Sequence, residues 1–205
     1  MSGRGAVGRD NASVQAARRA ISSYEAGLLA AVLLLVGVSL LCGVVSFSRG
    51  RVRGNAHEIL MGVVTACQQL YREYGGWPGA LQTEGYDMEF GARRRNRELM
   101  NILTAIAGQG NPGHSVNPVR LVFLRDVDFW RRGRAGMDQT GDLLDPWGTP
   151  VRVVIDSNDD GFCTAETGEI EPVADEKAIA WSAGRDRIFG TDDDIHSWRR
   201  IPPRH

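Results

Sequence analysis

The sequence lacks the short motifs that mark the common classes of enzyme. It contains no Gly-x-Ser-x-Gly, no His-Glu-x-x-His and no Gly-rich phosphate loop. Its four histidines are scattered singly along the chain, and isolated histidines are usually structural or surface residues. We therefore expect that the protein is not an enzyme.

Cysteine and net charge are also sparse. Three cysteines in 205 residues cannot form a complete set of disulfides, although a bond between Cys67 and Cys163 stays open in an oxidising compartment. The formal net charge is −1. The arginine clusters at 93–95 and 131–132 have no interleaved aromatic residues, which is typical of solvated faces. No nucleic-acid partner is expected.

What the sequence does contain is one long apolar run, at residues 26–47. The run holds no charge and, at about 22 residues, would span roughly 33 Å as a helix, enough to cross a bilayer core. Glu25 lies at its edge, where a carboxylate is costly and is by default a functional-site hypothesis. The arginines of residues 1–19 mildly favour a cytoplasmic N-terminus.

The segment from Arg18 to Glu25 resembles the prepilin signal of type IV pilins and pseudopilins. In that family a basic leader ends in a small residue, a hydrophobic residue opens the mature chain, and a Glu occupies its fifth position. Ala20, Ile21 and Glu25 match these positions. The resemblance implies cleavage after Ala20 by a prepilin peptidase and methylation of the new amine. It also implies pairing of Glu25 with the amine of Ile21, its own or a neighbour's, as helices pack into a filament.

Two other interpretations of this N-terminal segment stay open. A secretory signal peptide has an apolar core of about 7–15 residues followed by a small-residue cleavage site. The run here is longer, and arginines at 49, 51 and 53 follow it. A plain signal anchor with an incidental Glu25 is the second alternative.

An amphipathic pattern follows the apolar run and predicts that the same helix continues. Apolar residues recur at alternating spacings of four and three, at Ala56, Leu60, Val63, Cys67, Leu70 and Tyr74. The Gly-Gly-Trp-Pro-Gly sequence at 75–79 predicts the end of the helix. We expect a hydrophobic stalk from about Ile21 to Tyr74, preceded by a disordered leader at 1–19.

The remaining residues predict a small α+β domain. A second helix is expected from Arg94 to Ala107, ending at Gly108. Its inward-facing residues would be Leu99, Ile102, Leu103 and Ile106. Short β-prone runs at 119–124, 151–155 and 178–181 are bounded by Gly, Pro, Asp or Asn. They predict a small antiparallel sheet packed against the stalk helix.

The sequence Asp-Pro-Trp-Gly-Thr-Pro at 145–150 closely resembles a segment of the major pseudopilin of type II secretion. Pro and Gly would shape a turn there, and Trp147 would bury its ring beneath it. We expect a structural role for this segment and no chemistry.

Acidic residues near the C-terminus predict a calcium site. Four carboxylates within nine positions would repel one another unless a cation or water neutralised them, and Ca²⁺ takes six to eight oxygen ligands. The stretch is similar to the calcium loop of the pseudopilin, although Arg187 stands where the family usually has Gly. The resemblance implies Asp186 and Asp194 as leading ligands, Asp192 and Asp193 as candidates, and carbonyls near 183 and 188 as further ligands. An acidic, solvated loop without metal is the alternative.

A second acidic group, at 156–161, has the opening of an EF-hand loop. The twelfth position would be Thr167, which cannot serve as a bidentate ligand, and no flanking helix is evident. A polar hairpin turn is favoured over a second calcium site.

The leader, the stalk and the C-terminal third together resemble a type II secretion pseudopilin. The resemblance implies a pilin-like fold with a cleaved leader at 1–20, a transmembrane assembly helix at 21–48 and a periplasmic head at 49–205. It implies a single-pass protein of the bacterial inner membrane that polymerises into a pseudopilus. The implied partners are further copies of itself, other pseudopilins, the prepilin peptidase, the inner-membrane secretion platform and membrane lipid.

Three alternatives to a secretion pseudopilin stay open. The chain could be a membrane-anchored, calcium-binding periplasmic module that does not polymerise, or a pilin of a related pilus or DNA-uptake system. An anchored hydrolase with a catalytic metal is disfavoured, because no nucleophile or base accompanies the acidic loop.

Overall fold

The protein is an α+β protein whose first helix belongs to two compact units, Met1–Arg49 and Gly50–His205. The computed structural model describes the backbone of residues 7–198 and the side chains of residues 28, 31–40 and 50–198. Helix α1 (Val7–Tyr74) contributes to both units. The disorder predicted for 1–19 is wrong from Val7 onward, where the chain is helical; this segment contains three Ala and three Arg, which favour helix.

Much of the N-terminal prediction concerns side chains that lie outside the described residues. These include Ala20, Ile21 and Glu25, as well as most of the predicted membrane segment at 21–48. Within the described part of the chain, no helix has a stretch long and apolar enough to cross a membrane.

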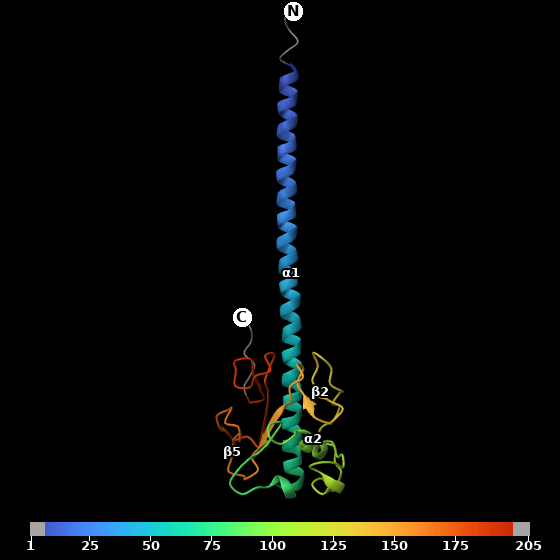
Figure 1. Cartoon of the computed structure of the whole chain (residues 1–205), viewed down its shortest axis with the longest axis vertical. Helices are drawn as coiled ribbons and strands as arrows, with labels where there is room; N and C mark the ends of the chain where they lie inside the picture. Colours follow the sequence, from blue (N-terminus) through green and yellow to red (C-terminus); the bar gives the residue numbers. More distant parts are fainter. Residues whose placement is uncertain (1–6, 199–205) are drawn as a thin grey trace, which may run out of the picture. The chain divides into compact units, whose positions relative to one another are not determined.

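The C-terminal part of α1, from Gly50 to Tyr74, forms the centre of the second unit (Figure 1). The predicted apolar stripe is confirmed from Ala56 to Leu70, since Ala56, Leu60, Val63, Cys67 and Leu70 are all fully buried, and its last member, Tyr74, is partly buried against the same core. The predicted end is also confirmed. The Gly76 N–H donates to the Tyr71 carbonyl at 2.9 Å, and both Gly75 and Gly76 have positive φ, which closes the helix.

A four-stranded antiparallel sheet packs against this part of α1. Its strand order is β1 (Met88–Phe90), β4 (Arg152–Ile155), β7 (Ala178–Ser182) and β8 (Ile195–His196). The predicted runs at 151–155 and 178–181 are confirmed as β4 and β7. Alternate residues of these two strands serve two cores, because side chains alternate across a sheet. Val153 and Ala180 face α1, whereas Val154 and Trp181 face a smaller cluster that includes Cys163.

The β-strand predicted at 119–124 is wrong. The side-chain amide of Asn117 donates to the Leu121 carbonyl and accepts from the Leu121 N–H, while Arg120 has φ 59°. The N–H groups of Phe123 and Leu124 both donate to the Leu103 carbonyl at the end of a helix. These backbone groups are therefore engaged locally and do not form a ladder.

The second helix, α2 (Arg97–Leu103), is shorter than predicted at both ends. Leu99, Ile102 and Leu103 are buried as expected, but Ile106 is exposed. The chain leaves the helix at Ala105, whose φ is 56°. Ile106 is thereby carried off the inward face.

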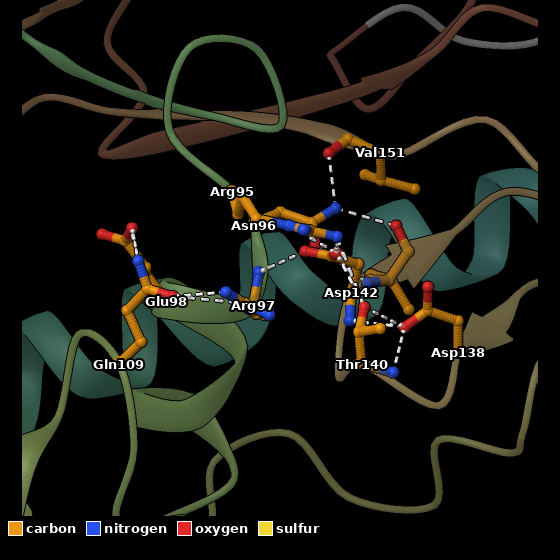
Figure 2. Close-up of polar contacts among 10 residues, drawn as sticks. Arg95, Asn96, Arg97, Glu98, Gln109, Asp138, Thr140, Asp142 and Val151 are labelled. Carbon is orange, nitrogen blue, oxygen red and sulfur yellow. Dashed lines mark hydrogen bonds and ion pairs between the residues drawn. The ribbon is translucent and has the colours of Figure 1, made fainter.

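The start of α2 is fixed by a polar network that sequence reasoning did not find (Figure 2). Asp142 accepts from the Arg97 N–H at 3.2 Å and from Arg95 Nε at 2.9 Å. Buried Asn96 donates to the carbonyls of Leu143 and Val151 at 2.8 and 2.9 Å. Because both segments come from more than 40 positions away, α2 begins where tertiary contacts satisfy its first donors.

Short elements complete the second unit. Two-residue strands form the ribbons β2 (Gly136–Met137) with β3 (Leu143–Leu144), and β5 (Phe162–Cys163) with β6 (Val173–Ala174). Single 3₁₀ turns lie at η1 (Gly79–Leu81) and η2 (Pro112–His114).

Candidate functional site: the acidic β7–β8 loop

The β7–β8 loop, residues 183–194, carries the predicted calcium ligands and has a tightly constrained backbone. Gly184 has φ 70°, and a Cβ there would lie 2.3 Å from the Asp193 carbonyl oxygen, so only glycine fits. Arg187 has φ 63°, in the left-handed region that favours glycine. The turn after Asp186 therefore forms with an arginine in a conformation that glycine adopts more readily.

Asp193 is used to fasten this loop to helix α1. One carboxylate oxygen accepts from the backbone N–H groups of Arg185 and Asp186, and the other accepts from Arg53 Nη1 at 3.1 Å. Arg53 lies 140 positions earlier, on α1. A carboxylate engaged by three donors, one of them cationic, is poorly suited to a metal ion.

Asp194 is in the opposite situation. It is only 8% exposed, and its Oδ2 accepts from the Gly190 N–H at 2.8 Å. Its Oδ1 is buried and has no hydrogen-bond partner. Burial raises the pKa of Asp194, and the negative charges of Asp186 and Glu169 add to this, against hydrogen bonds from Gly190 and Thr191. A buried, unpartnered carboxylate oxygen is costly unless a cation or proton joins it.

The other two predicted ligands, Asp186 and Asp192, are exposed. Asp186 accepts from the Ile188 N–H and the Thr191 hydroxyl, each at 2.9 Å, and its charge acts on Asp194. Both oxygens of Asp186 thus accept hydrogen bonds within the loop, and Asp193 is directed to Arg53. Among the residues that the structure describes, no group of three or more His, Cys, Asp or Glu side chains could hold a metal ion.

A buried ion-pair cluster joins the β7–β8 loop to the sheet, and sequence reasoning missed it. Arg152 Nη1 lies 2.7 Å from Glu89 Oε1 and 3.1 Å from Glu169 Oε2. The Arg152 guanidinium also lies 4.2 Å from the centroid of the Phe189 ring, within the loop. The only sequence signal was an arginine at the start of an otherwise apolar strand.

The second acidic segment, residues 156–161, is the loop between β4 and β5. Lys177 Nζ donates to Asp156 Oδ2 and Asp159 Oδ1, each at 2.7 Å. Tyr71 of α1 also donates to Asp159 at 2.9 Å. Burial lowers the pKa of Lys177, but the two carboxylates raise it by more. The counter-cation of this loop is therefore Lys177, which lies just before β7.

Asp145, which opens the Asp-Pro-Trp-Gly-Thr-Pro segment, organises that turn. Its Oδ1 accepts from the N–H groups of Trp147 and Thr149, and its Oδ2 accepts from the Ser182 hydroxyl at 2.6 Å. Burial raises its pKa against these hydrogen bonds. The prediction for the indole was partly wrong: Trp147 is half-buried, and Trp130 packs against the turn and donates to the Asp145 carbonyl at 2.7 Å.

Cys67 and Cys163 are both buried and free, so the disulfide left open by the sequence is not formed. They belong to the two different core clusters, one on each face of the sheet. Burial raises the pKa of Cys67 to about 12. Both side chains act as small apolar residues.

No family model, curated protein or solved structure matches this chain.

Proposed function

We propose that this protein is a structural subunit of a type II secretion pseudopilus. Its N-terminal segment would be cleaved after Ala20 by a prepilin peptidase, leaving Ile21 as the first residue. The apolar run would anchor the subunit in the inner membrane, with the second unit as a periplasmic head. Helix packing would then form the filament, with Glu25 pairing with a terminal amine to set the register between subunits.

The observation that carries this proposal is the composition of α1. One helix contains the prepilin-like sequence, the apolar run and the stripe that is buried in the head. A small antiparallel sheet packs against that stripe, and the Asp-Pro-Trp-Gly-Thr-Pro turn precedes β4. A helix that is apolar in one half and amphipathic in the other suits a subunit that leaves the membrane for a filament. Repeated head-to-tail contacts that do not close would generate such a filament.

Calcium binding at the β7–β8 loop is part of the proposal. The unpartnered Oδ1 of Asp194 and the exposed carboxylate of Asp186 in the same loop would supply oxygen ligands to a hard cation, whereas Asp193 would not, because Arg53 occupies it. Carbonyl oxygens and water would supply the remaining ligands. The bound ion would neutralise the buried carboxylate and stiffen the loop against the sheet.

Intact mass and N-terminal sequencing of the protein purified from membranes test the proposal. A mature chain starting at Ile21, with a methylated amine, is the expected result. A chain still starting near Met1 would contradict the prepilin route and leave a membrane-anchored calcium-binding module. A start after about Ser46 would indicate an ordinary secreted protein. Loss of cleavage in an Ala20→Arg variant, with Gln15→Arg as the matched control, would localise the processing site.

A further inference from the structure

The loop that precedes β2 lies against the first residues of the head. The Ala135 N–H donates to Asn55 Oδ1 of α1 at 2.8 Å. The tip of the loop is held by hydrogen bonds from Gly133 N–H to the Pro146 carbonyl and from Arg134 N–H to the Arg131 carbonyl, both 2.8 Å long. A hollow of about 600 Å³ separates the tip from α1. These hydrogen bonds fix the shape of the loop and hold it against α1.

This surface is basic. Its four arginines are all exposed: Arg51 on α1, and Arg131, Arg132 and Arg134 on the loop. The acidic side chains beside them are Asp128, which lies 2.8 Å from Arg134, Glu58, which lines the hollow, and Asp126, which lines the adjoining hollow together with Arg125. Positive charge is thus in excess here, although the whole chain has a formal net charge of −1. We call these four arginines, together with Phe129, the basic surface.

Phe129 supplies the apolar component. It is 78% exposed, more than any other large apolar side chain in the described part of the protein. It lies two residues from Arg131 and immediately after Asp128, the partner of Arg134. An exposed aromatic ring among arginines is the combination that binds at the interface of an anionic membrane, where the ring enters the acyl boundary and the charges meet headgroups.

Covalent continuity places this surface near the proposed membrane. Arg51 follows Phe47, the last residue of the apolar run, by four residues. Residues 47–51 are helical within α1, so Arg51 lies only about 6 Å beyond the end of the run along the helix axis. The headgroup layer extends several ångströms beyond the hydrocarbon core on each side. Arg51 would therefore meet headgroups if the run lies in a bilayer.

We propose that the basic surface binds anionic phospholipid headgroups, with Phe129 inserted at the membrane interface. This inference rests on the proposed function, since it requires the apolar run to be embedded. Lipid binding would hold the head of an unassembled subunit in one orientation on the membrane, and the contact would be lost when the subunit enters a filament.

A fluorescent label at position 129 can test the contact in the full chain. We would prepare Phe129→Cys in a Cys42→Ser background, because Cys67 and Cys163 are buried thiols with raised pKa values. The labelled chain would be reconstituted into phosphatidylcholine vesicles with and without phosphatidylglycerol, and lipid-borne quenchers would report contact. Val119→Cys is the matched control, because Val119 is 60% exposed. It lies two residues from Asn117, whose Oδ1 accepts a hydrogen bond from the Tyr74 hydroxyl at the C-terminal end of α1.

We expect the label to be quenched at position 129 but not at position 119. Quenching at 129 should require phosphatidylglycerol and should weaken in high salt. Replacing Arg131 and Arg132 by Gln should lower the ratio of bound to free head about 25-fold, at roughly fivefold per arginine. Removing the same charge from exposed Arg72 and Arg93 should leave the ratio unchanged.

Three results would overturn the inference while leaving the proposed function intact. The label could stay unquenched in a chain that co-floats with vesicles in alkaline carbonate. Quenching could be equal in neutral and anionic vesicles. The label at position 129 could become protected in detergent, without vesicles, as protein concentration rises. That result would assign the basic surface to contact with an acidic surface of another protein molecule. A chain that fails to co-float would overturn both proposals.

Discussion

The two acidic loops of the head neutralise their charge in different ways. In the β4–β5 loop, Asp156 and Asp159 share the ammonium group of Lys177, and Asp156 also accepts from two backbone N–H groups. In the β7–β8 loop, Arg53 reaches Asp193 but leaves Asp194 with a buried, unpartnered oxygen. Similar acidic sequences therefore give one loop whose buried carboxylate, Asp156, is paired with a lysine, and one whose buried carboxylate, Asp194, has an oxygen without a protein partner.

Sequence composition could not distinguish these cases, because the counter-cation comes from elsewhere in the chain. Lys177 is 21 positions from Asp156, and Arg53 is 140 positions from Asp193. A calcium site is better sought where a buried carboxylate is left without a protein partner than where aspartates are simply most frequent.

The largest expected effect comes from removing Lys177, the cation that pairs with the β4–β5 loop. Lys177→Met should lower the free energy of unfolding by about 2–3 kcal/mol, because it strands the Asp156 carboxylate, whose side chain is 0% exposed. Partial exposure of Lys177 keeps the loss at the lower end of the range for buried pairs. Thermal melts of the detergent-solubilised full chain would measure it, with Lys177→Arg as the control.

Lys177→Met should also leave the β4–β5 loop with a buried carboxylate that has no protein cation, as in the β7–β8 loop. We expect Ca²⁺ to restore part of the lost melting temperature of Lys177→Met, beyond its effect on the unaltered protein. A variant that melts like the unaltered protein would show that Lys177 is dispensable and would remove the basis of the contrast between the loops.

Calcium should stabilise the protein through Asp194. Saturation at 100 times the Kd would contribute about 2.7 kcal/mol by mass action, and Asp194→Asn should abolish this increment. Asp192→Asn is the matched control, because Asp192 is exposed in the same loop and should retain the increment. Melts in Ca²⁺ and in chelator would measure both. Loss of the increment in Asp192→Asn alone would assign the ion to different ligands.

Without calcium, Asp194 should make stability depend on pH. Burial raises its pKa in the folded state, so folded protein holds this proton at pH values where the unfolded chain has lost it. Stability due to this group is thus present at low pH and is lost as pH rises from about 4 through the raised pKa.

The corresponding measurement compares calcium-free melts of the unaltered protein and Asp194→Asn between acidic and neutral pH. As pH rises, the free energy of unfolding of Asp194→Asn should increase by about 1 kcal/mol relative to that of the unaltered protein, since the variant removes the unpaired charge. Other buried carboxyl groups are common to both proteins and cancel in the difference. An unchanging difference across the pH range would mean that Asp194 is not destabilised by ionisation.

The smallest effect concerns the link between the β7–β8 loop and α1. Arg53→Gln should cost about 0.5 kcal/mol, because the two side chains are 29% and 30% exposed and exposed ion pairs contribute little. Asp193 would keep its two backbone donors. Arg51→Gln is the control, since Arg51 is exposed on the same helix. A loss as large as that of Lys177→Met would make the two loops equivalent in their dependence on a protein cation.

Patterns that extend over many residues could be predicted from the sequence. The stripe from Ala56 to Leu70 repeats often enough to identify a helix face, and the glycines at 75 and 76 mark its end. The runs at β4 and β7 are apolar enough to predict strands. Strands β1 and β8 were missed because two or three residues carry no periodicity, and their pairing partners lie far away.

Local competition for backbone groups explains the predictions that were wrong. The Val-rich segment at 119–124 has strand composition, but Asn117 and the Leu103 carbonyl bind its backbone first. Ile106 fits the helical pattern, but the chain turns at Ala105 before reaching it. Neither outcome can be derived from composition, because the first depends on hydrogen bonds to Asn117 and Leu103, and the second on the left-handed φ of Ala105.

The sequence by itself determined that this chain has a buried helix face, a small apolar sheet and two acidic segments, because these follow from the order and polarity of neighbouring residues. Only the tertiary structure decided that Asp193 binds Arg53 while Asp194 is buried with a free oxygen. The two residues are adjacent and chemically identical, so they differ only in what the fold places beside them.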